Sequence, residues 1–208
     1  MITRRWIAGA AVLAACSAPA GGPAPAGPGP AAADPAADTT AALVPVGRGT
    51  LRQDEATIQL RQGPLLIKVT PLTEAVIRLM APDTYDRLRA LAASRSAELE
   101  SQSADPPELF LVSFFSYEPD VEYQPEDLQI AQQGRLLRPH TILPVSGEFG
   151  RQRLKQQETQ MAVYAFEPPI EYDRPMTVRY GTGQSDEWDR IIPRLEAERA
   201  RVRARGGS

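Results

Sequence analysis

A change in composition near residue 43 decides which part of this 208-residue chain can fold. Residues 17–42 are almost entirely Ala, Pro and Gly. Such a stretch has little apolar surface beyond methyl groups, so it cannot offset the entropy lost on ordering. Proline biases it toward an extended conformation, which suits a semi-rigid tether. Residues 43–208 are instead rich in Leu, Val, Ile, Phe and Tyr, and they suffice for one domain with its own core.

The first 15 residues have the three parts of an export signal. Two arginines form a basic tip, an apolar run follows, and small residues come directly before Cys16. The apolar run is shorter than the roughly 20 residues that a membrane-spanning helix needs. The sequence therefore predicts a signal peptide over residues 1–15 and a mature chain that begins at Cys16.

The run Leu13-Ala14-Ala15-Cys16 resembles the lipobox of bacterial lipoproteins. The resemblance implies that lipoprotein-processing enzymes add a diacylglyceryl group to the Cys16 thiol and cleave between Ala15 and Cys16. A third acyl chain, such as palmitate, then usually joins the new amino terminus. Because two or three chains hold a protein to a bilayer far better than one, the lipid bilayer is the first expected partner. The alternative is an ordinary secretory signal with a free cysteine at its cleavage site.

Sorting within the envelope depends on the residue after the lipidated cysteine. Ser17 stands where an Asp would be the inner-membrane retention signal. By the same resemblance, Ser17 implies the periplasmic face of the outer membrane in a bacterium with two membranes. Residues 16–42 are then the lipidated cysteine and its tether, and residues 43–208 are the exported domain.

Charge and cysteine content exclude some classes of protein. The net charge is −3 for the whole chain, and loss of Arg4 and Arg5 with the signal would make it −5. A mildly acidic chain gains nothing from counterion release, so no nucleic-acid partner is expected. Cys16 is the only cysteine, so the domain must be stable without disulfide bonds in an oxidising compartment.

Short runs of alternating apolar and polar residues, separated by turn residues, predict a mainly β fold. Residues 57–61 and 65–69 alternate on either side of a Gln-Gly-Pro turn, and residues 128–132 alternate before Gln133-Gly134. Residues 109–117 are apolar on both faces, which is typical of a central strand. Further extended segments are predicted at residues 136–137, 140–143, 160–167 and 176–180.

Two amphipathic helices are expected beside the strands. Apolar residues recur near the helical period in residues 83–100, which predicts a helix packed across a sheet. Residues 187–205 predict a C-terminal helix. Its first turns contain Trp188 and other apolar side chains, and its last turns contain arginines, which are favourable at the C-terminal end of a helix. Residues 71–80 fit either a helix that starts after Thr70 or a strand.

Several local patterns in residues 109–180 are similar to those of the telokin-like, immunoglobulin-type domains of bacterial surface lipoproteins. Two strand ends lie at residues 115–117 and 166–168. A proline-rich corner leads through residues 127–130 to a turn at residues 134–135, and a closing strand lies at residues 178–180. The resemblance implies an antiparallel immunoglobulin-like β-sandwich with one or two appended helices. It also implies a binding or scaffolding role, without catalytic residues.

No metal or cofactor site is predicted. His140 is the only histidine, which is too few for a multi-histidine metal centre, and it is expected on the surface. The acidic residues in 118–127 either offer carboxylate oxygens to calcium or form an extended, solvated connection. Their spacing fits no EF-hand, which favours the solvated connection. The pair Gly181 and Gly183 lacks the third glycine of a dinucleotide-binding fingerprint. The acidic residues are Glu118, Asp120, Glu122, Glu126 and Asp127.

Tyrosines at strand ends either close the core or contact a partner, because each has an apolar ring and a polar tip. Core closure is the favoured interpretation. If the domain has a partner surface, we expect it near Tyr123, Tyr172 and Phe149. Phe149 lies in a glycine-rich, basic loop at residues 147–155, where an exposed aromatic ring would be unfavourable without a function.

Three functions remain open at this point. The leading one is a membrane-anchored extracytoplasmic lipoprotein that acts as a non-catalytic binding or structural module of the envelope, with an envelope protein as partner. The alternatives are an accessory subunit of an assembly or secretion machine that docks through its C-terminal helix, and an envelope-polymer hydrolase that uses Glu122 and Asp127. A binding module predicts a flat apolar patch, and a docking subunit predicts an exposed stripe on the helix after Trp188. An enzyme predicts a deep pocket lined by acidic groups.

Overall fold

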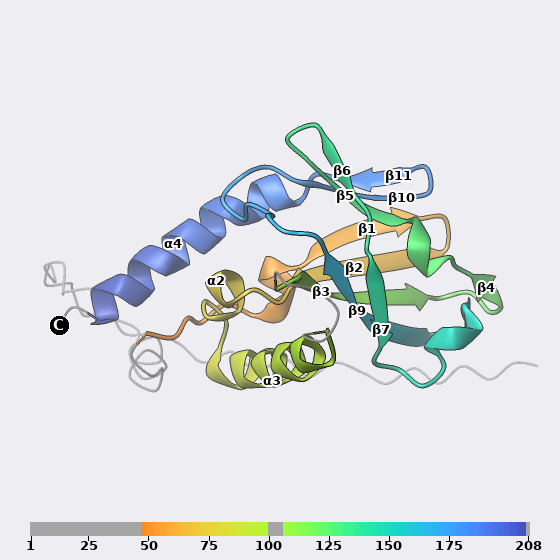
Figure 1. The fold of residues 1–208 in the computed structure, drawn as a ribbon, viewed down its shortest axis with the longest axis horizontal. Coiled ribbons are helices and arrows are strands. Elements are labelled where there is room, and N and C mark those ends of the chain that lie inside the picture. The colour runs from red at the N-terminus through yellow and green to blue at the C-terminus, as the bar shows by residue number, and fades with distance from the viewer. Residues whose placement is uncertain (1–46, 100–105, 207–208) are drawn as a thin grey trace, which may run out of the picture. The chain divides into compact units, whose positions relative to one another are not determined.

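A five-stranded antiparallel sheet with the order β1-β2-β3-β9-β7 organises the domain (Figure 1). The computed structural model describes residues 47–99 and 106–206, so the signal peptide, Ala15, Cys16 and the tether lie outside the described residues. The central strand is β3, as the two-faced apolar run predicted. The strands are β1 (Ile58–Gln62), β2 (Leu65–Pro71), β3 (Glu108–Ser116), β7 (Thr141–Pro144) and β9 (Glu158–Phe166).

A smaller antiparallel sheet has the order β11-β10-β5-β6, and it is built from two hairpins. Residues Gln133 and Gly134 make the first turn with positive φ angles of 50° and 76°, which glycine adopts without strain. A separate two-stranded sheet pairs β4 (Val121–Glu122) with β8 (Arg153–Leu154). The strands of the smaller sheet are β5 (Leu128–Gln132), β6 (Arg135–Leu137), β10 (Thr177–Tyr180) and β11 (Gly183–Ser185).

The two larger sheets bury their facing side chains in one core. The Phe114 ring from β3 lies 5.7 Å from the Tyr180 ring from β10, centroid to centroid. Phe110 on the same face of β3 contacts Phe166 at 5.4 Å. The domain is therefore mainly β, with antiparallel sheets in a sandwich-like arrangement and appended helices, which confirms the predicted fold class.

The two predicted amphipathic helices are confirmed within a residue or two. Helix α3 (Pro82–Leu99) is tied to both edges of the five-stranded sheet, because Arg87 donates to Gln53 Oε1 beside β1 and Arg95 donates to Pro144 O in β7. The ambiguous residues 71–80 contain the end of β2 and a short helix, α2 (Glu74–Ile77). The described residues also contain three single turns of 3₁₀ helix: η1 (Gln53–Ala56), η2 (Pro125–Asp127) and η3 (Phe149–Arg151).

The C-terminal helix α4 (Trp188–Gly206) packs its apolar side chains onto the domain. Trp188, Ile191, Leu195 and Val202 are buried. They are held near the β1 edge, where Gln59 donates its backbone N–H to Glu187 Oε2 and Arg194 donates to Glu55 O. These apolar residues stabilise the fold and are not free to contact a docking partner.

Candidate functional site

Tyr123 and Phe149 lie inside the core rather than on a partner surface. Tyr123 is 2% exposed, its ring stacks on Phe114 at 4.4 Å, and its hydroxyl donates to Gln160 Oε1 at 2.6 Å. Phe149 is 4% exposed and its ring lies 5.7 Å from the Tyr123 ring. The expectation that Phe149 is exposed is wrong, because η3 turns the glycine-rich loop back toward β9 and inserts the ring beside Tyr123.

Tyr172 also closes the core, although it is only half-buried. Its hydroxyl donates to Glu108 Oε2 at 2.8 Å, and its ring lies 6.0 Å from Phe110 and 6.1 Å from Trp188. Burial, followed by the negative charge of Glu108, raises the pKa of Tyr172. Of the two roles considered for these tyrosines, the contacts fit core closure.

The acidic residues of 118–127 are spread over a surface connection. Glu122 pairs with Arg153, which also lies 3.8 Å from Asp120. Asp127 ends η2 and faces a different recess, next to Arg179. Within residues 47–99 and 106–206, no three His, Cys, Asp or Glu side chains are close enough together to hold a metal ion.

The remaining motif residues also have structural positions. His140 is exposed just before β7, and its backbone N–H donates to Ala165 O at 3.0 Å. Gly181 lies in the two-residue turn between β10 and β11, and Gly183 begins β11. At this turn, Gln62 Nε2 donates to Thr182 Oγ1 at 3.0 Å. The glycine pair thus belongs to a hairpin, the setting in which a positive φ such as the 53° of Gly181 is common.

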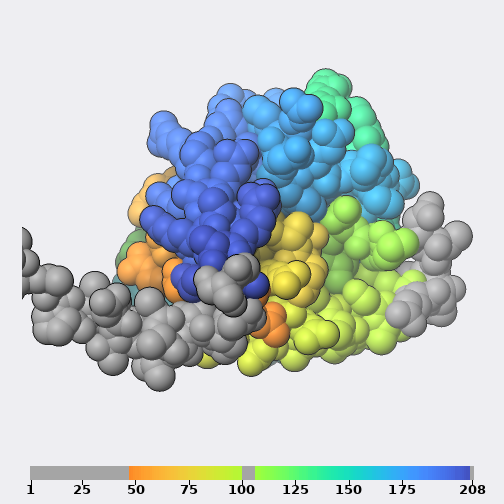
Figure 2. All heavy atoms as spheres, turned by 90° about the vertical axis from the view of Figure 1, so that its left-hand side faces the viewer, coloured from red at the N-terminus to blue at the C-terminus, as the bar shows by residue number. Residues whose placement is uncertain are grey.

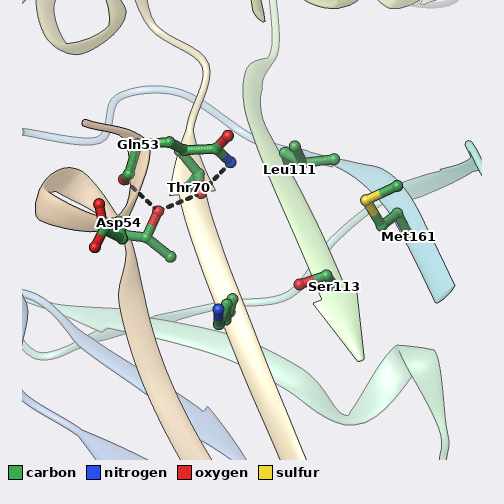
Figure 3. A pocket seen from close by; sticks show the side chains of 8 residues that line it. Gln53, Asp54, Thr70, Leu111, Ser113 and Met161 are labelled. Atoms are coloured by element: carbon green, nitrogen blue, oxygen red, sulfur yellow. Dashed lines mark hydrogen bonds between the residues drawn. The ribbon is translucent and has the colours of Figure 1, made fainter. Parts of the chain in front are cut away.

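A pocket of about 360 Å³ opens on the outer face of the five-stranded sheet (Figure 3). Side chains alternate between the two faces of β3. Phe110 and Phe114 face the core, so Leu111 and Ser113 face outward and line the pocket. Its volume lies at the lower end of the range typical of small-ligand pockets. The lining residues come from η1, β2, β3 and β9 and are Gln53, Asp54, Thr57, Lys68, Thr70, Leu111, Ser113 and Met161.

One wall of the pocket is held rigid by buried hydroxyl groups. The hydroxyls of Thr57 and Thr70 lie 2.7 Å apart, and Thr57 Oγ1 donates to Gln53 O at 2.7 Å (Figure 3). Gln53 Nε2 in turn donates to Thr70 Oγ1 at 3.3 Å. Because Thr57 and Thr70 are buried, these bonds fix η1 against β2 and preorganise the wall.

Lys68 gives the pocket a positive charge that no described residue pairs. Its cross-strand neighbour is Ser113, and within the described residues neither side chain has a hydrogen bond or an ion pair to another group. The other charged lining residue, Asp54, is already paired with Arg52 at 3.0 Å. An ammonium beside a free hydroxyl is suited to a carboxylate or a phosphate.

The pocket continues into a small apolar patch. Leu66 and Phe115 are cross-strand neighbours one step along from Lys68 and Ser113. Beyond them, Tyr117 is 57% exposed, and its ring lies 4.6 Å from the Phe115 ring in an edge-to-face contact. We call Leu66, Lys68, Ser113, Phe115 and Met161 the open sheet face.

A second polar centre holds the start of the described chain. Residues 47–51, here the lead-in segment, run between α2 and α4. Glu198 of α4 is fully buried and accepts hydrogen bonds from Thr50 N at 2.8 Å and Thr50 Oγ1 at 3.0 Å. Arg205 donates to Arg48 O at 2.8 Å, and the Arg48 guanidinium lies 3.5 Å from the centre of the Tyr85 ring.

Hydrogen bonds keep Glu198 ionised in this buried position. Burial alone raises the pKa of Glu198, but donation from Thr50, Arg201 and Arg205 outweighs burial, so the pKa lies below its ordinary value. The sequence pattern did not identify Glu198, because a glutamate on a charged helix has the same local appearance whether it is buried or exposed.

No family model, curated protein or solved structure matches this chain. In the described part of the chain, neither long helix has a continuous apolar stretch sufficient to cross a bilayer.

Proposed function

We propose that this chain is a membrane-anchored lipoprotein of the cell envelope whose domain is a non-catalytic binding module, with the open sheet face as its binding surface. The lipobox-like run that ends at Cys16 supports the anchor. The observation that carries the binding role is the Lys68 ammonium, which lies without an ionic partner among the described residues in a pocket beside apolar side chains. Isolated charges of this kind gain most when a partner supplies the opposite charge.

The chemistry of the open sheet face indicates what kind of partner would fit. A carboxylate would accept hydrogen bonds from Lys68 and Ser113, while apolar side chains next to that carboxylate would cover Phe115 and Met161. We therefore expect an envelope protein that presents an acidic residue flanked by apolar residues. Tyr117 at the margin would add contact area with little loss of side-chain entropy.

The two other functions have less support from the same contacts. A subunit that docks through α4 would present apolar residues, but Trp188, Ile191 and Leu195 are buried against the domain. A hydrolase would bring Glu122 and Asp127 to one deep pocket, but Glu122 pairs with Arg153 and Asp127 lines a recess with Arg179.

The anchor is tested by metabolic labelling of cells with a fatty acid. We expect the wild-type protein to carry the label and the Cys16→Ser variant to remain an unlabelled precursor of higher mass. An ordinary secretory signal would give an unlabelled wild-type protein and a Cys16→Ser variant that is cleaved at the same site. That result would overturn the lipid anchor and leave the binding surface to be judged separately.

The binding surface is tested by photo-crosslinking in intact cells. The photoreactive residue p-benzoylphenylalanine is placed at Tyr117 or, as the matched control, at Leu136, which is 47% exposed and lies in the other sheet. We expect a discrete crosslinked species from position 117 only. Lys68→Met in the same chain should reduce the yield several-fold. Equal crosslinking from both positions, no crosslinking from position 117, or no effect of Lys68→Met would contradict the proposal.

A further inference from the structure

A recess of about 480 Å³ lies between α2 and the last turns of α4, on a part of the surface that the proposed function does not use. Arg78 contributes to it as the C-cap residue of α2, and Arg199 and Arg203 contribute from α4. Its apolar floor consists of Ala75, Leu79 and Val202. We call Arg78, Arg199 and Arg203 with this floor the arginine recess. Figure 2 looks onto this end of the domain, where the dark blue end of α4 lies beside the yellow α2.

The three arginines have no ionic partner in the part of the chain that the structure describes. Within the described residues, Arg78 donates from Nε to Gly47 O at 3.1 Å and Arg203 donates from Nε to Arg199 O at 3.4 Å, but none of the three forms an ion pair with a carboxylate. Among the described residues, Glu74 is the acidic residue that lines the recess, and it accepts a hydrogen bond from Tyr85 at 2.6 Å. The recess therefore has a local positive charge on a chain whose net charge is −3.

Helix stability does not account for this arrangement. Arg199 and Arg203 are four residues apart, so the two like charges are neighbours on one helix face and weaken the helix. The helix dipole favours basic residues only in the last turn, which includes Arg203 but not Arg199. Arg78 belongs to a different element altogether. An anionic ligand would explain why three arginines, one from the end of α2 and two from α4, line the same recess.

Guanidinium groups bind phosphate oxygens through paired, parallel hydrogen bonds. Three of them around an apolar floor suit phosphates that are attached to apolar material. Phospholipid headgroups at a membrane surface have this combination, and an anionic leaflet attracts clustered arginines. The chemistry of the recess thus matches an anionic phospholipid surface.

The recess also lies where the N-terminal part of the chain joins the domain. Arg78 contacts the lead-in segment at Gly47, and Arg205 and Glu198 hold residues Arg48 and Thr50. Only about thirty residues separate Gly47 from Cys16, a stretch that spans at most about 100 Å when fully extended. An acylated Cys16 would hold this end of the domain near the lipid and raise the effective concentration of headgroups at the recess.

We infer that the arginine recess docks on the phosphate groups of anionic phospholipids and holds this end of the domain against the membrane. The inference rests on the proposed lipid anchor for its membrane, and it adds an orientation: the lead-in segment faces the bilayer. The open sheet face, on β2, β3 and β9, is left available for a protein partner.

Vesicle flotation with the full-length Cys16→Ser chain tests the recess without the acyl chains. The probes are vesicles of phosphatidylcholine alone and vesicles that also contain phosphatidylglycerol. We expect preferential, salt-sensitive binding to the phosphatidylglycerol vesicles. Replacing Arg78, Arg199 and Arg203 by Gln should weaken that binding about a hundredfold, because each arginine near an anionic surface contributes roughly fivefold.

The matched control replaces three exposed arginines elsewhere, Arg61, Arg135 and Arg179, by Gln. It changes the net charge equally and should weaken binding by less than about fivefold. The apolar signal segment is present in every variant, so its contribution cancels in the comparison. Circular dichroism of each variant verifies that the fold is retained.

Several outcomes would overturn the inference. Equal losses in the two triple variants would show a general charge effect, and an unchanged recess variant would show that the arginines do not bind lipid. Displacement of the protein from vesicles by inorganic phosphate at matched ionic strength would assign the recess to free phosphate. Fatty-acid labelling reports on the anchor separately. If the protein is labelled but the recess variant binds vesicles as well as its parent, only the docking is refuted. If the protein is unlabelled but the recess variant loses vesicle binding, only the anchor is refuted.

Discussion

The carboxylate of Glu198 accepts hydrogen bonds from both the backbone N–H and the hydroxyl of Thr50, a residue 148 positions earlier in the chain. Arg201 and Arg205 donate to the same carboxylate at 3.2 and 3.4 Å. These bonds join the C-terminal helix to the lead-in segment. If the chain is held to a membrane through residues on the N-terminal side, any pull on the domain first acts on this junction.

Substitution Glu198→Gln should lower the free energy of unfolding by about 2 kcal/mol, because it removes a buried negative charge that accepts hydrogen bonds from Thr50, Arg201 and Arg205. Equilibrium unfolding in urea measures the change. Glu196→Gln, an exposed substitution on the same helix, should change stability by less than about 0.5 kcal/mol and is the control. A Glu198→Gln variant as stable as the control would show that the negative charge of this carboxylate contributes nothing to stability.

The same carboxylate makes stability depend on pH. Folding lowers the pKa of Glu198. The ionised carboxylate therefore contributes fully to the unfolding free energy above the pKa of glutamate in the unfolded chain, about 4.3. This contribution is lost as the pH falls through the lower pKa of the folded state. The difference in unfolding free energy between wild type and Glu198→Gln should therefore be constant from pH 7 to about 5 and shrink below about 4. Urea unfolding across this range measures it, and a difference that grew toward acid pH would contradict the assignment.

Gly49→Ala should destabilise the domain by about 1–3 kcal/mol. An added Cβ at this position would lie 1.8 Å from Leu79 O, so the lead-in segment could no longer approach α2 and keep its bonds from Gly49 N to Arg78 O and from Leu51 N to Leu79 O. Gly147→Ala is the matched control, because a Cβ there meets nothing within 4 Å. Thermal unfolding of the two variants should differ clearly, and equal midpoints would refute the close approach.

Phe149→Ala should lower stability by about 3–5 kcal/mol, the usual result of removing a buried phenyl ring. The ring contacts Phe114 and Tyr123, so its loss leaves a cavity between η3 and β3. Leu136→Ala removes a side chain that is 47% exposed and should have a small effect by comparison. If Phe149→Ala proved as mild as Leu136→Ala, the loop would not be packed on the core.

Three tyrosines should resist ionisation while the domain is folded. Burial raises the pKa of Tyr123, Tyr164 and Tyr172, so above about pH 10 the unfolded chain ionises where the folded one does not, and stability falls as the pH rises. In an alkaline titration, we expect part of the tyrosinate absorbance to develop only together with loss of the circular dichroism signal. Complete tyrosinate formation with the fold intact would refute the burial of these rings.

Local patterns were enough to predict most elements of the domain. The alternation in residues 57–61 and 65–69 became β1 and β2, and the apolar run at residues 109–117 became the central strand. Prediction was weaker where elements were short: the pairing of β4 with β8 spans two residues in each strand, too few for any periodicity to be visible.

Two positions in the folded domain were harder to predict. Phe149 was expected at the surface because its neighbours are glycine and basic residues, but a 3₁₀ turn buries it. Nothing in the local sequence distinguishes Lys68 from other lysines of alternating strands. That Lys68 lines a pocket and has no ionic partner among the described residues becomes visible only once β2, β3 and η1 are placed side by side.

By itself, the sequence determined the β class and the two long helices, because alternation and helical periodicity are local properties of the chain. Only the tertiary structure decided that Glu198 meets Thr50, that Phe149 is buried, and that Arg78 joins Arg199 and Arg203. These relationships link residues far apart in the chain. Their energies depend on burial and on distances between side chains, which no local pattern encodes.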